Sequence, residues 1–140
     1  MKRVALIVVA MLALSPAAAS AFKLRQFHIP GGNIGCGLIA GKESGGGEAR
    51  CDIRHHSWKA PPKPGWCELD WGSGMVVGPR KEAGFVCAGD TVLNQGRVLS
   101  TGSYAKLGPF SCKSLPGAVR CINRTSGHGF KLSRKVASAF

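Results

Sequence analysis

Six cysteines constrain this chain more than any other feature of its sequence. No two of them are spaced as Cys-x-x-Cys, the arrangement typical of zinc ribbons and thioredoxin-type redox sites. An even number of cysteines in a short chain that carries an export signal indicates disulfides instead. Because six cysteines can pair in many ways, the pairing must be predicted from local pattern. The cysteines are Cys36, Cys51, Cys67, Cys87, Cys112 and Cys121.

The start of the chain has the pattern of a secretory signal peptide. Two basic residues follow the initial methionine, residues 4–14 are apolar, and small residues then lead to Ala21. The apolar run is shorter than the roughly 20 residues that a membrane-spanning helix needs, so cleavage after Ala21 is expected rather than anchoring. We therefore predict a signal peptide over residues 1–21 and a single disulfide-rich β domain over residues 22–140. The mature chain is expected to have no membrane span and to be secreted or periplasmic.

Two of the cysteines lie in strand-like sequence. Cys51 stands two residues from Ala49 and two from Ile53 in a stretch that alternates between polar and apolar residues. Cys36 has similar neighbours, and the glycine-rich segment 41–48 separates the two stretches. Alternate residues of a strand share a face, so a hairpin would place the two cysteines opposite each other. The pattern predicts a Cys36–Cys51 disulfide.

A second hairpin is centred on Pro116-Gly117. Cys112 and Cys121 each lie four residues from this dipeptide, and a turn there brings them face to face. The remaining two cysteines, Cys67 and Cys87, are paired by elimination. The prediction is therefore nearest-neighbour pairing along the whole chain.

The rest of the sequence favours short strands and many turns, since glycine supplies 20 of the 140 residues. The proline-rich segment 58–66 is expected to be an extended crossing outside any central sheet. Near the end, Leu132, Val136 and Phe140 recur every four residues, a spacing compatible with a short closing helix. The predicted fold is all-β and mainly antiparallel, a small sandwich or barrel stapled by three disulfides. Strands are expected near residues 22–29, 33–39, 49–55, 74–77, 84–88, 98–104, 109–113, 119–123 and 129–132.

The cysteine framework and its flanking residues resemble a family of small exported bacterial proteins that carries a domain of unknown function. The resemblance covers nearly all of the mature chain. It implies export and disulfides, and it carries over no functional residue. The motifs that carry it are Phe27-x-x-Pro30-x-Gly32-Asn33-Ile34-x-Cys36, Arg50-Cys51-Asp52-Ile53, Cys67-x-x-Asp70-Trp71-Gly72, Phe85-Val86-Cys87-x-Gly89-Asp90-Thr91, Phe110-x-Cys112 and Gly127-His128-Gly129-Phe130-x-Leu132-Ser133-Arg134.

No catalytic, cofactor-binding or metal-binding motif is present in the sequence. Three residues are nevertheless candidates for a functional surface: Trp66, Trp71 and His128. Exposed tryptophans can stack on sugar rings or nucleobases, although in a domain this small packing in the core is the favoured role. His128 stands between two glycines, where a loop can display its side chain.

The charge of the mature chain suggests a class of partner. Without Lys2 and Arg3, 17 of the 19 basic residues remain against 7 acidic ones, a net charge of +10. Such a chain attracts anionic polymers without sequence preference. We therefore expect a non-catalytic binding domain that contacts anionic polymers or another component of the envelope or extracellular space. The alternatives are a small secreted hydrolase, with a ribonuclease-like use of His55 and His128 as its least strained form, and an inhibitor of another secreted protein.

Overall fold

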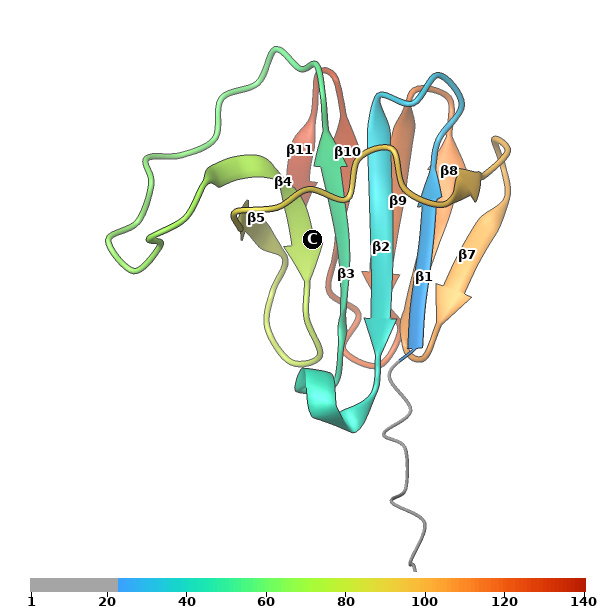
Figure 1. The fold of residues 1–140 in the computed structure, drawn as a ribbon, viewed down its shortest axis with the longest axis horizontal. Coiled ribbons are helices and arrows are strands. Elements are labelled where there is room, and N and C mark those ends of the chain that lie inside the picture. The colour runs from blue at the N-terminus through green and yellow to red at the C-terminus, as the bar shows by residue number, and fades with distance from the viewer. Residues whose placement is uncertain (1–22) are drawn as a thin grey trace, which may run out of the picture.

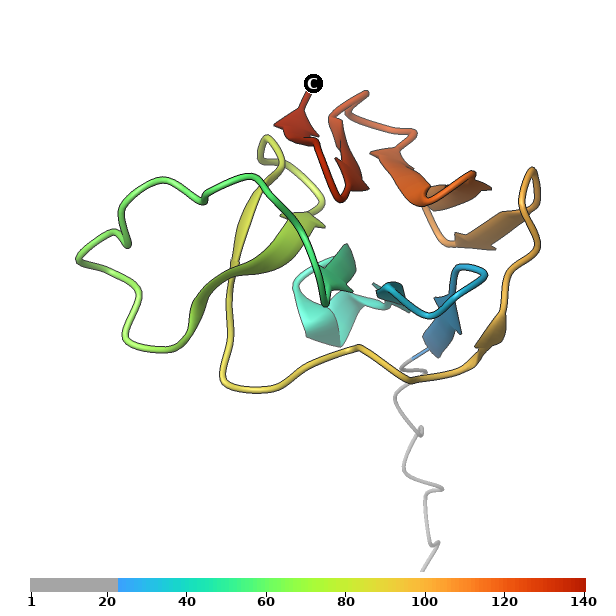
Figure 2. The same cartoon turned by 90° about the horizontal axis from the view of Figure 1, so that it is seen from above.

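The computed structural model describes residues 23–140, and the predicted signal peptide, residues 1–21, lies outside them. The described chain forms two β-sheets that face each other (Figures 1 and 2). It contains no α-helix within this range, only a 3-10 turn at Lys42–Ser44, and therefore no helix there that could cross a membrane. The strands are β1 (Lys23–His28), β2 (Ile34–Ala40), β3 (Glu48–Ile53), β4 (Trp71–Val77), β5 (Gly84–Cys87), β6 (Arg97–Val98), β7 (Tyr104–Leu107), β8 (Phe110–Leu115), β9 (Ala118–Asn123), β10 (Gly129–Ser133) and β11 (Ala137–Ala139).

Sheet A has the strand order β5-β4-β3-β2-β1-β6, and sheet B has the order β11-β10-β9-β8-β7. All neighbouring strands are antiparallel except the short pair of β1 with β6. The all-β, mainly antiparallel class predicted from the sequence is confirmed. The sheets pack through one core, because alternate residues of each strand point between them.

The three predicted disulfides are all present: Cys36–Cys51, Cys67–Cys87 and Cys112–Cys121. Cys36 lies directly opposite Cys51 on β2 and β3, and Cys112 lies directly opposite Cys121 on β8 and β9. The turn between β8 and β9 consists of Pro116 and Gly117, as the sequence predicted.

The two sheets share one plan, built around these cross-strand disulfides. In sheet A the row Phe27, Cys36, Cys51 and Met75 runs across β1 to β4, and all four side chains are buried. In sheet B, β7 to β10 carry a corresponding buried row. Each sheet therefore contains four antiparallel strands with a disulfide between the second and the third. The sheet B row is Ala105, Cys112, Cys121 and Phe130.

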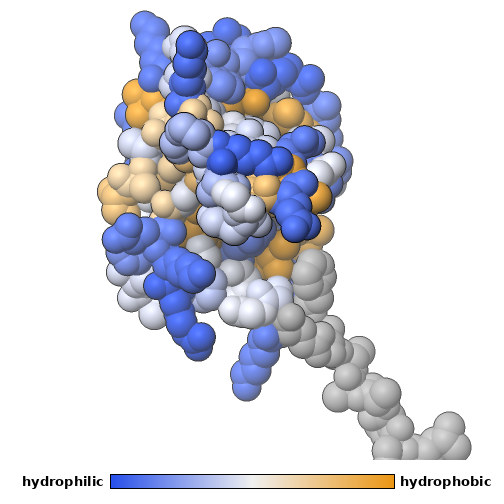
Figure 3. Space-filling view, turned by 90° about the vertical axis from the view of Figure 1, so that its left-hand side faces the viewer, coloured by the Kyte–Doolittle hydropathy of each residue, from blue (hydrophilic) through white to orange (hydrophobic). Residues whose placement is uncertain are grey.

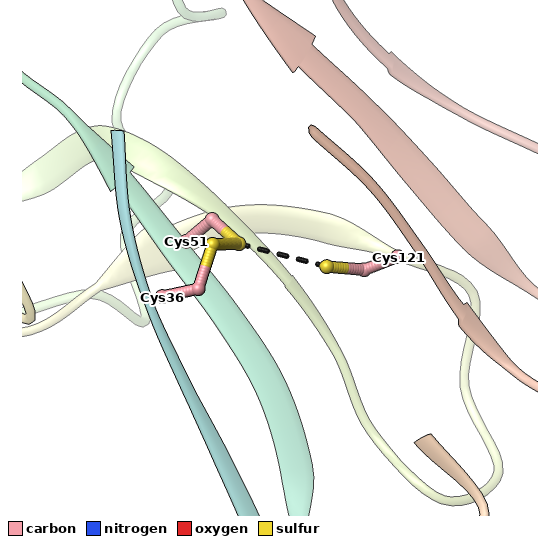
Figure 4. A group of neighbouring side chains, drawn as sticks. All are labelled: Cys36, Cys51 and Cys121. Carbon is pink, nitrogen blue, oxygen red and sulfur yellow. Dashed lines mark hydrogen bonds between the residues drawn. A yellow bond between two sulfur atoms is a disulfide. The ribbon is translucent and has the colours of Figure 1, made fainter. Parts of the chain in front are cut away.

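The two disulfides meet at the centre of the core. The Sγ atoms of Cys51 and Cys121 lie 3.6 Å apart (Figure 4). Both sulfurs already belong to disulfides, so neither carries a proton to donate and the contact is one of packing. Cys36, Cys51 and Cys121 are close enough together to suggest a metal site, but sulfurs bonded in disulfides are not thiolate ligands. The cluster is therefore a structural centre.

Two expectations for secondary structure are wrong. The predicted closing helix is instead the hairpin of β10 and β11, in which Leu132 pairs with Ala137. The Ser133 Oγ accepts hydrogen bonds from the backbone N–H groups of Lys135 and Val136, and this tight turn reverses the chain before a helix can form. In place of the strand predicted over residues 98–104, residues 99–103 connect β6 to β7, because the chain turns at residues 100–103.

A long connection, residues 88–96, crosses the outer face of sheet A; we call it the strap (Figures 1 and 2). The strap passes directly over Gly35. A Cβ atom at Gly35 would lie 2.5 Å from the carbonyl oxygen of Val92, whereas one at Gly37 would meet only side chains, those of Val92 at 3.4 Å and Gln26 at 3.9 Å. Gly35 therefore lets the strap approach the sheet.

Because of this geometry, we expect alanine substitutions at Gly35 and Gly37 to affect stability differently. We expect Gly35→Ala to lower the free energy of unfolding by about 1–3 kcal/mol, because the strap's backbone must move away from β2. Gly37→Ala is expected to change it by less than about 0.5 kcal/mol. Urea unfolding of both variants checks this, and equal losses would contradict the proposed contact with the strap.

Candidate binding sites

The outer face of sheet A is occupied by a buried ion-pair network. Arg50 and Asp52 point away from the core, since Cys51 between them points inward. The Arg50 guanidinium donates to both Asp52 carboxylate oxygens, at 3.0 and 2.8 Å, and to the Asp90 carboxylate at 2.8 Å. Thr91 Oγ1 and the backbone N–H of Val92 donate to Asp52 as well. The network fixes the strap to the sheet.

The charged groups of this network pair with one another within the protein. Asp52 is completely buried. Hydrogen bonding and charge attraction from Arg50 lower the pKa of Asp90, so that carboxylate stays ionised. Arg50 forms the only ion pairs among the residues whose side chains the structure describes, one with Asp52 and one with Asp90. The covered part of sheet A is therefore structural, although the motif Arg50-Cys51-Asp52 carried part of the family resemblance.

The outer face of sheet B has a very different charge. All seven acidic residues of the chain lie between positions 43 and 90, so sheet B contains none. Residues 91–140 carry eight basic side chains: Arg97, Lys106, Lys113, Arg120, Arg124, Lys131, Arg134 and Lys135. One side of the molecule is thus built from a segment with positive charges only.

Strand register aligns three of these side chains. Lys113 on β8 pairs with Arg120 on β9, and Arg120 pairs with Lys131 on β10. Each follows or precedes a buried core residue, so all three side chains point outward. Neighbouring strands are about 4.8 Å apart, so the row spans about 10 Å. We call Lys113, Arg120 and Lys131, together with Lys106 on β7, the basic face.

Aromatic rings lie beside this basic face. The Lys106 and Lys113 ammonium groups lie 5.4 and 5.2 Å from the centre of the Tyr104 ring, and the Arg120 guanidinium lies 4.1 Å from the centre of the Phe140 ring. Tyr104 is 51% exposed, so its ring remains accessible between the two lysines. These cation–π contacts orient the cations while leaving their charge uncompensated.

Like charges directly opposite each other on neighbouring strands destabilise a sheet. The row Lys113, Arg120 and Lys131 places two such pairs side by side without a carboxylate between them. A structural role would favour alternating signs at these positions. No ion pair within the described residues compensates these three charges.

The structure brings two of the sequence candidates together and separates the third. Trp66 and Trp71 meet edge to face, with ring centres 5.7 Å apart. Trp66 is 70% exposed, so the preference for packing is wrong for this residue. Packing holds for Trp58, which lies against the core and donates its indole N–H to the carbonyl of Ser133.

His128 lies on the turn between β9 and β10, away from the tryptophans. It lines a hollow of about 250 Å³ with Glu82, Ala139 and Phe140, and no lysine or arginine lines that hollow. His55 follows β3 at the other end of the sandwich. The two histidines that a ribonuclease-like mechanism would combine are therefore not brought together.

Comparison with known proteins identifies a family for this chain but no function. A family model described as a family of unknown function, DUF6636, matches residues 5–140. The chain belongs to this family. No curated protein and no solved structure matches the DUF6636 chain. The DUF6636 match therefore assigns the chain to a family and gives it no activity or ligand.

Part of the basic face could be predicted from the sequence alone. Once Cys112 is paired with Cys121 across a hairpin, Lys113 and Arg120 must face each other, and the predicted disulfide already implied this pair. The position of Lys131 depends on the register of β10, which no disulfide fixes. The complete row of Lys113, Arg120 and Lys131 could therefore not be predicted from the sequence of the DUF6636 domain, and it is seen only in the structure.

Proposed function

We propose that this protein is an exported, non-catalytic binding domain that contacts anionic polymers of the envelope or extracellular space through the outer face of sheet B. The observation that carries the proposal is the row Lys113, Arg120 and Lys131, which crosses three strands of an acid-free sheet. A linear polyanion that lies across the strands meets one cation on each. Tyr104 extends the row at the β7 edge, where it can contact a sugar or base.

Export to a secreted or periplasmic location is part of the same proposal. It is supported by the signal-like residues 1–21 and by three disulfides, which are consistent with an oxidising compartment. Anionic polymers such as teichoic acids, acidic glycans and lipid headgroups are the partners that a basic exported surface meets there. The shared chemistry is a repeated phosphate, sulfate or carboxylate group.

The test compares two variants of equal charge. In the first, Lys113, Arg120 and Lys131 are each replaced by glutamine; in the second, the exposed residues Lys23, Lys59 and Lys63 are replaced in the same way. Binding of a fluorescent heparin octasaccharide is measured at several salt concentrations between about 50 and 200 mM.

We expect the wild type still to bind at about 0.1 M salt, where charges on the protein are screened beyond about 10 Å. The sheet B variant should bind about a hundredfold more weakly, and the slope of log affinity against log salt should fall by about 2–3. The control variant should lose less than about fivefold, through net charge alone. Equal losses in both variants would show that total charge, and no particular face, determines binding.

A further inference from the structure

A second surface, formed by sheet A and the loop that carries Trp66, has the form of a ligand cavity. It lies beside the edge strand β5, between the β4–β5 hairpin and the loop that carries Trp66, and its volume is about 520 Å³. This volume falls within the range of about 300–1,000 Å³ found for small-molecule sites. Trp66, Trp71 and Phe85 supply aromatic surface to its lining. On this side of the molecule, apolar patches lie between projecting hydrophilic side chains (Figure 3).

The aromatic surface is held rigidly. The Cys67–Cys87 disulfide ties the residue after Trp66 to the end of β5. The backbone N–H of Cys67 donates to Pro64 at 3.0 Å, and the Trp71 indole N–H donates to the Pro61 carbonyl at 2.8 Å. The proline-rich loop is therefore hydrogen-bonded to Trp71 and to the residue after Trp66. A large aromatic side chain that is fixed and yet 70% exposed is typical of a binding surface.

The polar groups around the cavity carry both signs of charge. Glu48 and Glu82 contribute carboxylates, and Arg80 and Lys81 contribute cations. Burial raises the pKa of Glu48, which favours the neutral carboxyl form. Because both signs are present, the cavity lacks the purely positive charge of the basic face. A neutral ligand rich in hydroxyl groups can use both acceptors and donors.

A pyranose ring fits this combination. One face of the ring carries C–H groups that pack on an indole, and its edge carries hydroxyls that pair with carboxylates and with basic side chains. The perpendicular rings of Trp66 and Trp71 form a corner, with an interplanar angle of 89°, that can contact two sides of such a ring.

We propose that the cavity lined by Trp66, Trp71 and Phe85 binds a neutral sugar residue of a glycan. Trp66 supplies the stacking surface, and Glu48 and Arg80 are placed to pair with the hydroxyls. The proposal goes beyond polyanion binding, because it assigns a second site with a different ligand chemistry. Together the two sites would let the domain contact a glycan chain and an acidic polymer at the same time.

The experiment measures binding of neutral tetrasaccharides, namely chitotetraose, cellotetraose and maltotetraose, to the oxidised protein by calorimetry. We expect at least one of the three to bind with a dissociation constant below about 1 mM and Trp66→Ala to weaken it by about tenfold or more. Trp66→Phe should retain part of the affinity, because it keeps an aromatic face. Leu69→Ala removes another exposed apolar side chain from the same loop, outside the cavity lining, and should leave the affinity unchanged.

Several outcomes would overturn this assignment. They are the absence of binding by all three sugars at millimolar concentration, an unchanged affinity in Trp66→Ala, and preferential binding of a proline-rich peptide. The two proposals fail independently, since the sheet B glutamine variant should bind the sugar normally and Trp66→Ala should bind heparin normally. Near-ultraviolet circular dichroism confirms that each variant is folded.

Discussion

Asp52→Ala is expected to lower the free energy of unfolding by about 3–5 kcal/mol, a large part of the stability of a domain this size. Asp52 is completely buried and accepts two hydrogen bonds from Arg50. It also accepts hydrogen bonds from Thr91 and from the backbone of Val92, and these join the strap to β3. Its removal leaves a partly buried guanidinium with one exposed partner, Asp90, and removes both hydrogen bonds from the strap to Asp52.

The matched control is Asp90→Ala, which removes the other carboxylate of the same network. The Asp90 side chain is 80% exposed, so we expect its loss to cost about 1 kcal/mol or less. Equilibrium unfolding in urea at neutral pH measures both variants. Similar, small losses in the two would show that the buried carboxylate does not hold the strap.

Loss of the Cys36–Cys51 disulfide is expected to have an effect of similar size. In the double variant Cys36→Ala, Cys51→Ala, the unfolded chain regains the freedom of a closed loop of 15 residues, worth about 3 kcal/mol. Two sulfur atoms are also removed from the fully buried contact with Cys121, and the resulting cavity adds to the loss.

The comparison variant lacks the Cys67–Cys87 disulfide, which closes a loop of similar length at the edge of sheet A. We expect this variant to be more stable than the Cys36–Cys51 variant by about 1 kcal/mol or more, because no core contact of the two sheets is lost. Urea unfolding of the two variants under non-reducing conditions gives the difference. Equal losses in the free energy of unfolding would contradict a central structural role for the contact between the Cys36–Cys51 and Cys112–Cys121 disulfides.

Local patterns predicted the disulfides and most strands because those features depend on neighbouring residues. Alternation around Cys51 and the symmetric position of Pro116-Gly117 needed no tertiary information. The closing helix was wrong because a four-residue spacing of Leu132, Val136 and Phe140 also fits a hairpin whose turn is fixed by Ser133.

The burial of Asp52 and the exposure of Trp66 depend on tertiary contacts and could not be predicted from local pattern. Asp52 alternates with buried residues and so has the pattern of a solvent-facing strand residue. It is buried because the strap, more than 30 positions away in the sequence, crosses over it. The exposure of Trp66 likewise depends on the disulfide of Cys67 with Cys87, which holds its loop at the edge of the sheet.

The central claim is that sheet B, and no other surface, receives the polyanion. A titration of the isotope-labelled domain with a heparin octasaccharide, followed residue by residue through amide chemical shifts, tests it most directly. We predict that the largest changes fall on Lys113, Arg120 and Lys131 and on their neighbours in β8, β9 and β10. Changes spread evenly over all lysines and arginines, or centred on the loop that carries Trp66, would contradict the account.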